Sequence, residues 1–259
     1  MDWYIYPILV AAGFACGFIN ILAGSGSLIT LPVLIFIGLP VNVANGTNRV
    51  AILFQNIVGV SRFQKSGLLD LKTGLMLALP AVAGGVVGAQ IAVNLDEQTM
   101  RLTIGGLMIV MLATLLIRPK RWLEGKGGKI AGKLTISRAF IFFLIGIYGG
   151  FIQAGVGIFL LAGLVLSAGY NLKLANPVKI LIILCFTIFA LIVFIINDQV
   201  RWEAGLILAV GNMSGGVGAT RLAVKRGAGF IRWVLILVLV ATASKMFGLF
   251  DVIAQQLNL

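Results

Sequence analysis

The stretch GFINILAGSGS, residues 17–27, interrupts an apolar run with polar and glycine residues, after which the chain returns to the apolar sequence LITLPVLIFIG. A related stretch, GFIQAGVG, occupies residues 150–157. The similarity continues beyond both breaks at a constant offset of 131 residues, so that the Ala-Asn pair 44–45 corresponds to 175–176 and the sequence GGV at 84–86 recurs at 215–217. The chain is therefore predicted to be an internal duplication with one broken apolar segment in each half.

The composition indicates an integral membrane protein. With 60% hydrophobic residues, 11% charged residues and a mean hydropathy of +1.08, the chain has more apolar surface than a soluble domain of 259 residues can bury. Helices of about 20 residues span a bilayer with all backbone groups bonded internally, and the short alternating patterns of barrel strands are absent. The predicted fold is all-α. The first apolar run lacks a preceding basic region and is expected to be a retained helix rather than a cleaved signal.

Each half contains five apolar segments, of which the second is too short to cross the membrane. Segments 27–38 and 157–168 have about twelve residues, which at 1.5 Å per residue cannot span about 30 Å. Each is predicted to form a hairpin with the segment before it, leaving three full crossings per half. The expected segments are 4–22, 27–38, 44–61, 73–93 and 99–117, followed by 138–153, 157–168, 174–196, 203–220 and 232–250.

Because three crossings is an odd number, the second repeat is predicted to be inverted relative to the first. Residues 1–117 would form the first repeat, 118–137 a cytoplasmic linker and 138–259 the second repeat. This topology puts most of the 20 basic residues in cytoplasmic loops and leaves only Arg101 and Arg201 in external ones, as the positive-inside rule expects. Both termini are then extracytoplasmic in the cell membrane.

The same topology explains the net charge of +12 without a nucleic-acid partner. The basic, glycine-rich linker has phosphate-loop spacing at Gly127, Gly132 and Lys133, but Leu134 stands where Ser or Thr is required, and no strand precedes it. Cys16 and Cys185 have no metal or disulfide spacing. No cofactor, metal or catalytic residue is expected, so we predict that the protein is not an enzyme.

The two breaks are the candidate anion site. Inverted repeats with broken helices are a recurring transporter architecture, in which half-helix N-termini near the membrane midplane attract anions through free N–H groups and the helix dipole. Alternatively, the small residues only permit close helix packing, which is our interpretation of Gly84, Gly85, Gly88, Gly215, Gly216 and Gly218. The candidate substrate-binding residues of the breaks are Asn20, Gly24, Ser25, Gly26, Ser27, Gln153, Gly155 and Gly157.

A second candidate group lies at ANGTNR, residues 44–49, and at ANPVK, residues 175–179. Arg49 and Lys179 fall inside apolar segments, where a cation is costly, and no acid is placed to pair with either, so a bound anion is the expected counter-charge. The alternative is that both side chains extend to the membrane interface. Asn45, Thr47, Asn48 and Asn176 are candidate neutral donors, with helix capping as the alternative for Asn45 and Asn176. Deeper polar residues either line a path or join helices, and we expect the second role for most of them; they are Gln55, Asn56, Thr187, Asn212 and Ser214. Lys245 is left unassigned.

The pattern GFINILAGSGSLITLPVL followed by GLPVNVANGTN, with its weaker second copy, resembles the signature of the TauE/SafE family of membrane transporters over nearly the whole chain. The resemblance implies a multi-pass protein of the cytoplasmic membrane that moves sulfite, sulfonates, thiosulfate or related organic anions. Ser25 and Ser27 depart from the family pattern, because glycine is common at both positions.

The expected function is secondary transport of a small anion by alternating access, with export of sulfite or a related sulfonate driven by the membrane potential. The alternatives are a passive anion channel, an importer of a small organic anion, a structural scaffold and an intramembrane hydrolase. Because the chain has no histidine for a Ser-His pair, the hydrolase would need Ser25 or Ser27 beside Lys179 or Lys245. The expected partners are the anion and the bilayer, with a homodimer left open.

Overall fold

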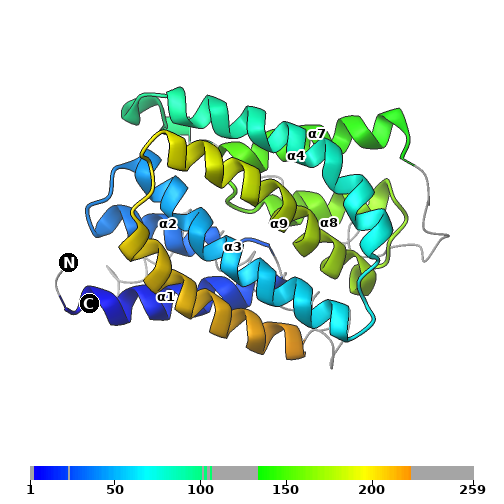
Figure 1. Cartoon of the computed structure of the whole chain (residues 1–259), viewed down its shortest axis with the longest axis horizontal. Helices are drawn as coiled ribbons and strands as arrows, with labels where there is room; N and C mark the ends of the chain where they lie inside the picture. Colours follow the sequence, from blue (N-terminus) through cyan, green and yellow to red (C-terminus); the bar gives the residue numbers. More distant parts are fainter. Residues whose placement is uncertain (1–2, 23, 101, 104–105, 107–133, 223–259) are drawn as a thin grey trace, which may run out of the picture.

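The structure is a computed structural model that describes residues 3–22, 24–100, 102–103, 106 and 134–222. The described part is a helical bundle without strands, which confirms the predicted all-α class (Figure 1). Its main helices are α1 (Ile5–Leu22), α2 (Ser27–Phe36), α3 (Val41–Lys65), α4 (Leu71–Asn94), α7 (Ile136–Phe151), α8 (Val156–Leu166) and α9 (Leu172–Ile196), and a further helix covers 202–222.

The helix lengths follow the predicted segments. Helices α2 and α8 have 10 and 11 residues, or about 15 Å each, and so reach only about halfway through a bilayer. Helices α1, α4 and α9 are long and apolar enough to cross it. The fifth segment of the first half, 99–117, lies mostly outside the described residues. Segment 232–250, linker residues 118–133 and Lys245 lie wholly outside them.

Helices α3 and α9 begin earlier than the sequence predicted. Pro40 precedes the first turn of α3, and Asn171 precedes that of α9, where its side chain accepts a hydrogen bond of 3.0 Å from the Leu174 N–H. Asn45 and Asn176 consequently lie inside the helices, and the capping alternative is wrong for both. The prediction placed the helix starts too late because it took polar residues as helix ends, although here they face the bundle interior.

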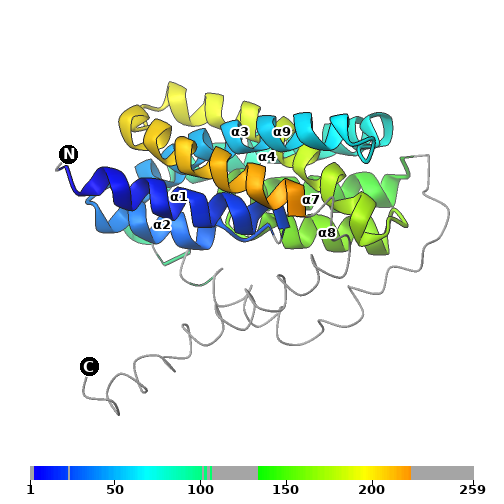
Figure 2. The same ribbon diagram turned by 90° about the horizontal axis from the view of Figure 1, so that it is seen from below.

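The two hairpins open at opposite ends of the bundle. The Tyr6 hydroxyl donates to Glu203 over 2.8 Å, which places the start of α1 beside the start of the helix over 202–222. At the other end, Arg138 near the start of α7 donates to the carbonyl of Ser167, just after α8. Figures 1 and 2 show the α1–α2 hairpin at one end and the α7–α8 hairpin at the other.

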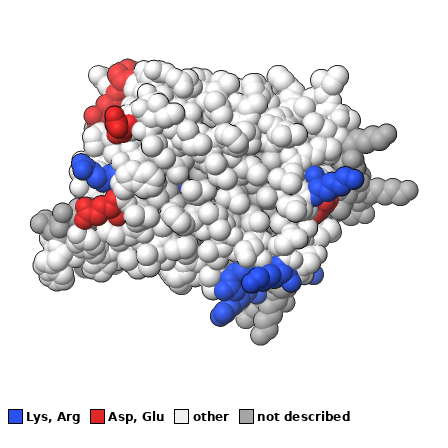
Figure 3. All heavy atoms as spheres, viewed as in Figure 1, with Lys and Arg blue, Asp and Glu red and all other residues white. Residues whose placement is uncertain are grey.

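Charged side chains gather at these two ends, and the middle of the molecule is uncharged in the view of Figure 3. The α3–α4 and α8–α9 connections lie together at one end of the bundle, where the Tyr170 hydroxyl donates to Asp70 over 2.9 Å. The connections that follow α4 and α9 lie together at the other end, where the Gln199 amide donates to the Val93 carbonyl over 3.1 Å. A band without charges between two polar ends is the surface expected of a multi-pass membrane protein.

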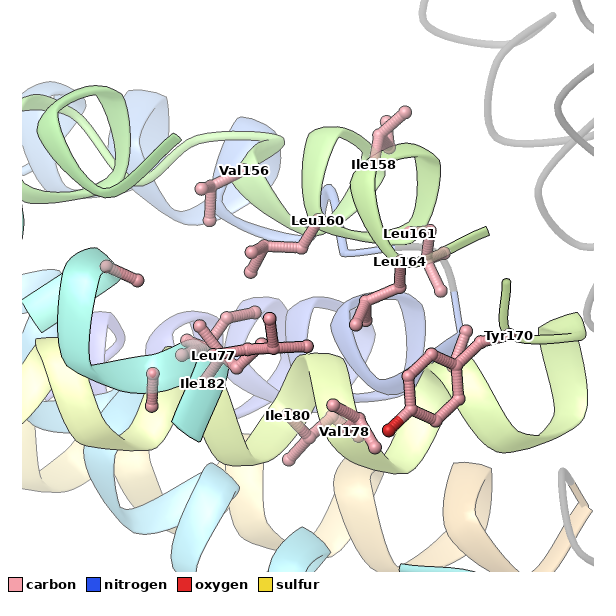
Figure 4. Close-up of a cluster of buried hydrophobic side chains, with 14 of the residues drawn as sticks. Leu77, Val156, Ile158, Leu160, Leu161, Leu164, Tyr170, Val178, Ile180 and Ile182 are labelled. Carbon is pink, nitrogen blue, oxygen red and sulfur yellow. The ribbon is translucent and has the colours of Figure 1, made fainter. Parts of the chain in front are cut away.

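Short helix α8 contributes much of the largest apolar cluster. Figure 4 shows Leu160 and Leu164 of α8 facing Ile182 and Val178 of α9, with Leu77 of α4 beside them. All five side chains are buried. This packing fixes the position of α8, and with it the position of its N-terminal end in the centre of the bundle.

Glycines allow the closest helix crossings. In α4, a Cβ at Gly84 would lie 2.1 Å from the Phe143 carbonyl oxygen of α7. Gly215, in the helix over 202–222, approaches the Phe14 carbonyl oxygen of α1 equally closely. Gly218 differs, because the nearest atom to its Cβ position is Phe18 Cδ2 at 4.0 Å. The packing interpretation therefore fits Gly84 and Gly215, whereas Gly218 has room for a side chain.

We expect Gly215→Ala to lower the free energy of unfolding by about 1–3 kcal/mol, because the added methyl group collides with backbone of α1. Gly218→Ala is the matched control in the same helix, and it should be neutral or stabilising because alanine favours helix. Thermal unfolding of both variants in detergent measures the difference. Equal melting temperatures for the two variants would show that the crossing is looser than described.

Asp70 gives a prediction on acid stability. Partial burial opposes ionisation of its carboxyl group, but hydrogen bonds from Thr73 and Tyr170 outweigh burial and lower its pKa. A lowered folded-state pKa contributes stability above the unfolded pKa of about 3.9, and that contribution is lost as pH falls through the folded pKa.

Asp70→Asn keeps a capping side chain but has no charge. We therefore expect it to lose less stability than wild type as the pH falls from about 5 to about 2, the range in which the carboxyl group of Asp70 becomes protonated. Melting temperatures measured across this range provide the check. Tyr170→Phe, which removes one bond to the carboxylate, should fall between the two proteins. Parallel pH profiles for all three would contradict the assignment.

Candidate functional site

The two breaks meet in the centre of the bundle through direct backbone contact. The Gly157 N–H donates to the Gly24 carbonyl over 3.3 Å. A Cβ at Gly24 would lie 2.3 Å from the Gly157 Cα, and a Cβ at Gly157 would lie 2.4 Å from the Gly24 Cα. Gly24 also has a φ of +77°, which side chains rarely permit. Two stretches that are far apart in the sequence thus form one centre that requires glycine on both sides.

This centre holds the N-terminal ends of both short helices. Helix α2 begins at Ser27 after Gly26, and α8 begins at Val156 after Gly155. The break residues therefore lie where the sequence placed them, at two half-helix N-termini. Their contact with an anion stays a prediction, since no ligand contact is observed.

One polar side chain in each break is held by the long helix of the same half. The Asn20 amide donates to Gln55 of α3 over 3.4 Å, while its oxygen accepts from the Gly26 N–H over 3.1 Å. The Gln153 amide donates to Thr187 of α9 over 2.6 Å. Gln55 and Thr187, which were expected mainly to join helices, therefore position the two breaks.

A second set of hydrogen bonds joins α2 to α3. The Asn48 amide donates to the Ser27 hydroxyl over 3.1 Å, and the Thr30 hydroxyl donates to the Asn48 oxygen over 2.7 Å. Sequence reasoning did not identify Thr30, although it follows Ser27 by one helical turn and so shares its face. It also did not identify Tyr148, whose hydroxyl donates to the Ala154 carbonyl in the second break.

Arg49 on α3 binds the C-terminal end of α7. Its guanidinium donates to the carbonyls of Gly149, over 3.1 Å, and Gly150, and lies 4.7 Å from the centre of the Phe194 ring. The side chain is fully buried. Asn45, one turn earlier on α3, donates to the next carbonyl of α7, that of Phe151, over 2.7 Å.

Lys179 on α9 makes the reciprocal contact with α1. Its ammonium donates to the carbonyls of Asn20 and Ile21 over 3.1 and 3.0 Å, at the end of α1. Helix C-termini carry unpaired carbonyls and partial negative charge, so each cation is stabilised by the first helix of the other half. From the sequence, the expected partners of these cations were a bound anion or the membrane interface. Helix carbonyls become possible partners only once the two halves are packed together.

Several predicted site residues retain unpaired polar atoms although they are buried. These atoms are the Ser25 hydroxyl oxygen, the Gln153 oxygen, both amide atoms of Asn176 and the Nε of Arg49. Ser25 is 2% exposed and Asn176 is not exposed at all. Unpaired polar groups are costly away from water, so their presence in the core indicates a ligand or water site.

Two of the predicted residues have other partners. The Thr47 hydroxyl accepts from the Arg201 N–H over 2.9 Å and so fixes the start of the helix over 202–222. Lys179 donates to α1, and no hydrogen bond joins it to Ser25 or Ser27 in the described part of the chain. The Ser-Lys pair that a hydrolase needs is therefore not formed by Lys179 in this conformation, and Lys245, the other candidate lysine, lies outside the described residues.

The electrostatics of the centre favour an anion. Two helix N-termini converge there, and Arg49 and Lys179 lie on the adjoining helices. Within the described ranges, no Asp or Glu is among the buried residues. The arrangement therefore offers positive potential and neutral donors, without a carboxylate that would repel an anion or bind a metal ion.

We expect Arg49→Met to reduce stability by about 3 kcal/mol, because two carbonyls at the end of α7 lose a charged donor. Arg49→Lys should lie between Met and wild type, since one ammonium replaces a forked donor. Thermal unfolding in detergent measures both variants. Arg201→Met removes an exposed cation at the bundle end and should change the melting temperature little; a loss equal to that of Arg49→Met would contradict the proposed role.

Comparison with known proteins identifies similar membrane proteins. A probable membrane transporter protein, ORF9, from Sinorhizobium sp is 27% identical over 253 residues, covering 96% of this chain and 94% of its own length. The probable membrane transporter protein YfcA of Escherichia coli K12 is 25% identical, with 96% and 91% coverage. YunE of Bacillus subtilis, also named a probable membrane transporter protein, is 23% identical, with 82% and 86% coverage.

No solved structure gives a significant match. The profile of a transporter family, described as sulfite exporter TauE/SafE, matches residues 9–246. That range includes both breaks, both buried cations and, apart from the first turn of α1, the helices that surround them. The chain therefore belongs to the sulfite exporter TauE/SafE family of membrane transporters.

Proposed function

We propose that this transporter exports sulfite or a related organosulfur anion, holding it between the N-termini of α2 and α8. The observation that carries the proposal is the backbone contact of Gly24 with Gly157, which brings both half-helix N-termini to one point. Converging N–H groups and helix dipoles favour a small oxyanion at that point. The description of the family as a sulfite exporter supports the same chemistry.

The transport mechanism in this proposal is alternating access between two inverted repeats. The hairpins open at opposite ends of the bundle, as two related halves of inverted topology would. Ser25, Gln153 and Asn176 are almost completely buried, so an anion reaches them only if one hairpin moves relative to the other. The described conformation then corresponds to a closed intermediate between the outward-open and inward-open states.

The orientation in this proposal places the end with the α3–α4 and α8–α9 connections in the cytoplasm, together with the linker, and both termini outside. Lys65 and Lys173 lie at that end, as the positive-inside rule favours. With a negative cell interior, each unit of negative charge moved outward gains about 2.3 kcal/mol per 100 mV. The membrane potential alone can therefore drive export.

The direct test is efflux of labelled sulfite, and of small sulfonates and carboxylates, from proteoliposomes with an imposed potassium diffusion potential. We expect saturable flux that follows the potential and accelerates with substrate on the opposite side. Flux that never saturates would indicate a passive channel instead. A purified protein that moves no anion of the panel would overturn the proposal.

A single hydroxyl tests the location of the site. Ser25→Ala removes a buried oxygen that has no protein partner, so the fold should keep its melting temperature while the KM for sulfite rises about tenfold, the value of one hydrogen bond to a charged group. Ser214→Ala is the matched control, because that hydroxyl donates to the Gly211 carbonyl of its own helix. Identical transport by both variants would place the anion elsewhere.

A further inference from the structure

A basic pocket lies at one end of the bundle, away from the two breaks. It has a volume of about 370 Å³, and its lining residues are Arg62, Lys65, Ser66, Thr220 and Arg221. Arg62 and Lys65 lie in the last turn of α3, Ser66 directly follows that helix, and Thr220 and Arg221 belong to the helix over 202–222. Figure 3 shows basic side chains gathered at the lower edge and at one end of the molecule. Neither the breaks nor the buried cations contribute to this pocket.

The packing of these two helices explains why the cations converge. Gly205 lies against Val50 and Gly216 lies against Gln55, so the helices run side by side in the same direction. Arg62 and Lys65 of α3 are therefore brought to the same end of the bundle as Arg221. Arg62 and Lys65 are one turn apart on α3 and share a face, and Arg221 of the neighbouring helix completes the group.

The pocket contains charged donors that have no acidic partner. Among the described residues, no carboxylate pairs with Arg62, Lys65 or Arg221. The nearest acid along the chain, Asp70, accepts hydrogen bonds from Thr73 and Tyr170 instead. The hydroxyl protons of the lining residues go to carbonyls of their own helices, so the three cations are the donors available to a ligand.

We propose that this pocket binds the phosphate group of an anionic phospholipid. Arg presents a planar fork of donors that matches phosphate oxygens, and Lys adds a point charge. The volume is within the range of small-ligand sites. Because the pocket lies beside the α3–α4 connection, next to the start of the membrane-spanning helix α4, a phosphate held in the lipid headgroup layer is at the matching height. A soluble phosphate ester would have to compete from solution.

The simpler interpretation is that these cations only fix the orientation of the protein in the membrane. That role needs positive charge at this end but no defined pocket, so any basic residue at the same end serves equally well. Lys173, which is exposed at the start of α9, provides the comparison. Binding that depends on the three pocket cations and not on Lys173 separates the two interpretations.

The experiment uses the full-length protein in detergent with equal amounts of phosphatidylglycerol and phosphatidylcholine, and native mass spectrometry measures the lipid retained. We expect retained phosphatidylglycerol in wild type. Arg62→Gln, Lys65→Gln and Arg221→Gln should each lower its affinity about fivefold, and Lys173→Gln should leave it unchanged. The same lipid should raise the wild-type melting temperature more than it raises that of the pocket variants.

Three results would overturn the proposal. The first is that wild type retains the two lipids equally. The second is that all three pocket variants retain as much phosphatidylglycerol as wild type, and the third is that Lys173→Gln loses as much affinity for this lipid as the pocket variants do. A parallel titration with glycerol phosphate distinguishes the source of the phosphate. Full displacement of the lipid by glycerol phosphate at about 1 mM would assign the pocket to a soluble ester. Size-exclusion profiles of each variant confirm that it remains folded, and the outcome does not depend on which anion is transported.

Discussion

The contact of Gly24 with Gly157 is the constraint on which the rest of the structure depends. Two chain segments approach until the Cβ of any other residue would overlap the opposite backbone. Helices α2 and α8 therefore begin beside this contact, and the preceding helices, α1 and α7, end just before it. A membrane protein can interrupt its helices in this way only if other groups satisfy the freed backbone atoms inside the protein.

The buried cations satisfy part of that requirement. Helices α1 and α7 both end within the bundle, and the carbonyls at their C-termini have no partners in their own helices. Lys179 supplies donors to the end of α1, and Arg49 supplies donors to the end of α7. Each cation comes from the half of the chain that does not contain the helix it binds. The two halves are therefore joined through the groups that make the breaks possible.

While the cations bind the helix ends, other polar groups at the centre have no protein partners. The Ser25 hydroxyl and the Asn176 amide are buried and unpaired, while the side chains of Ser27 and Asn20 have hydrogen-bond partners. The bonded residues hold the shape of the breaks, and in the proposed function the unpaired ones contact the anion. This division would allow the proposed anion site to exist in an apolar bundle that has no buried carboxylate among the described residues.

The sequence by itself determined the all-α membrane class, the short helices α2 and α8 and the position of each break, because hydrophobic length and glycine placement are local properties. It also identified Arg49 and Lys179 as unusual, since a cation inside an apolar segment is costly wherever it points. It did not show that Gly24 meets Gly157, that the two cations bind carbonyls, or that Gln55 and Thr187 position the breaks. Those contacts join residues of different helices, most of them far apart in the chain, so only the tertiary structure decided them.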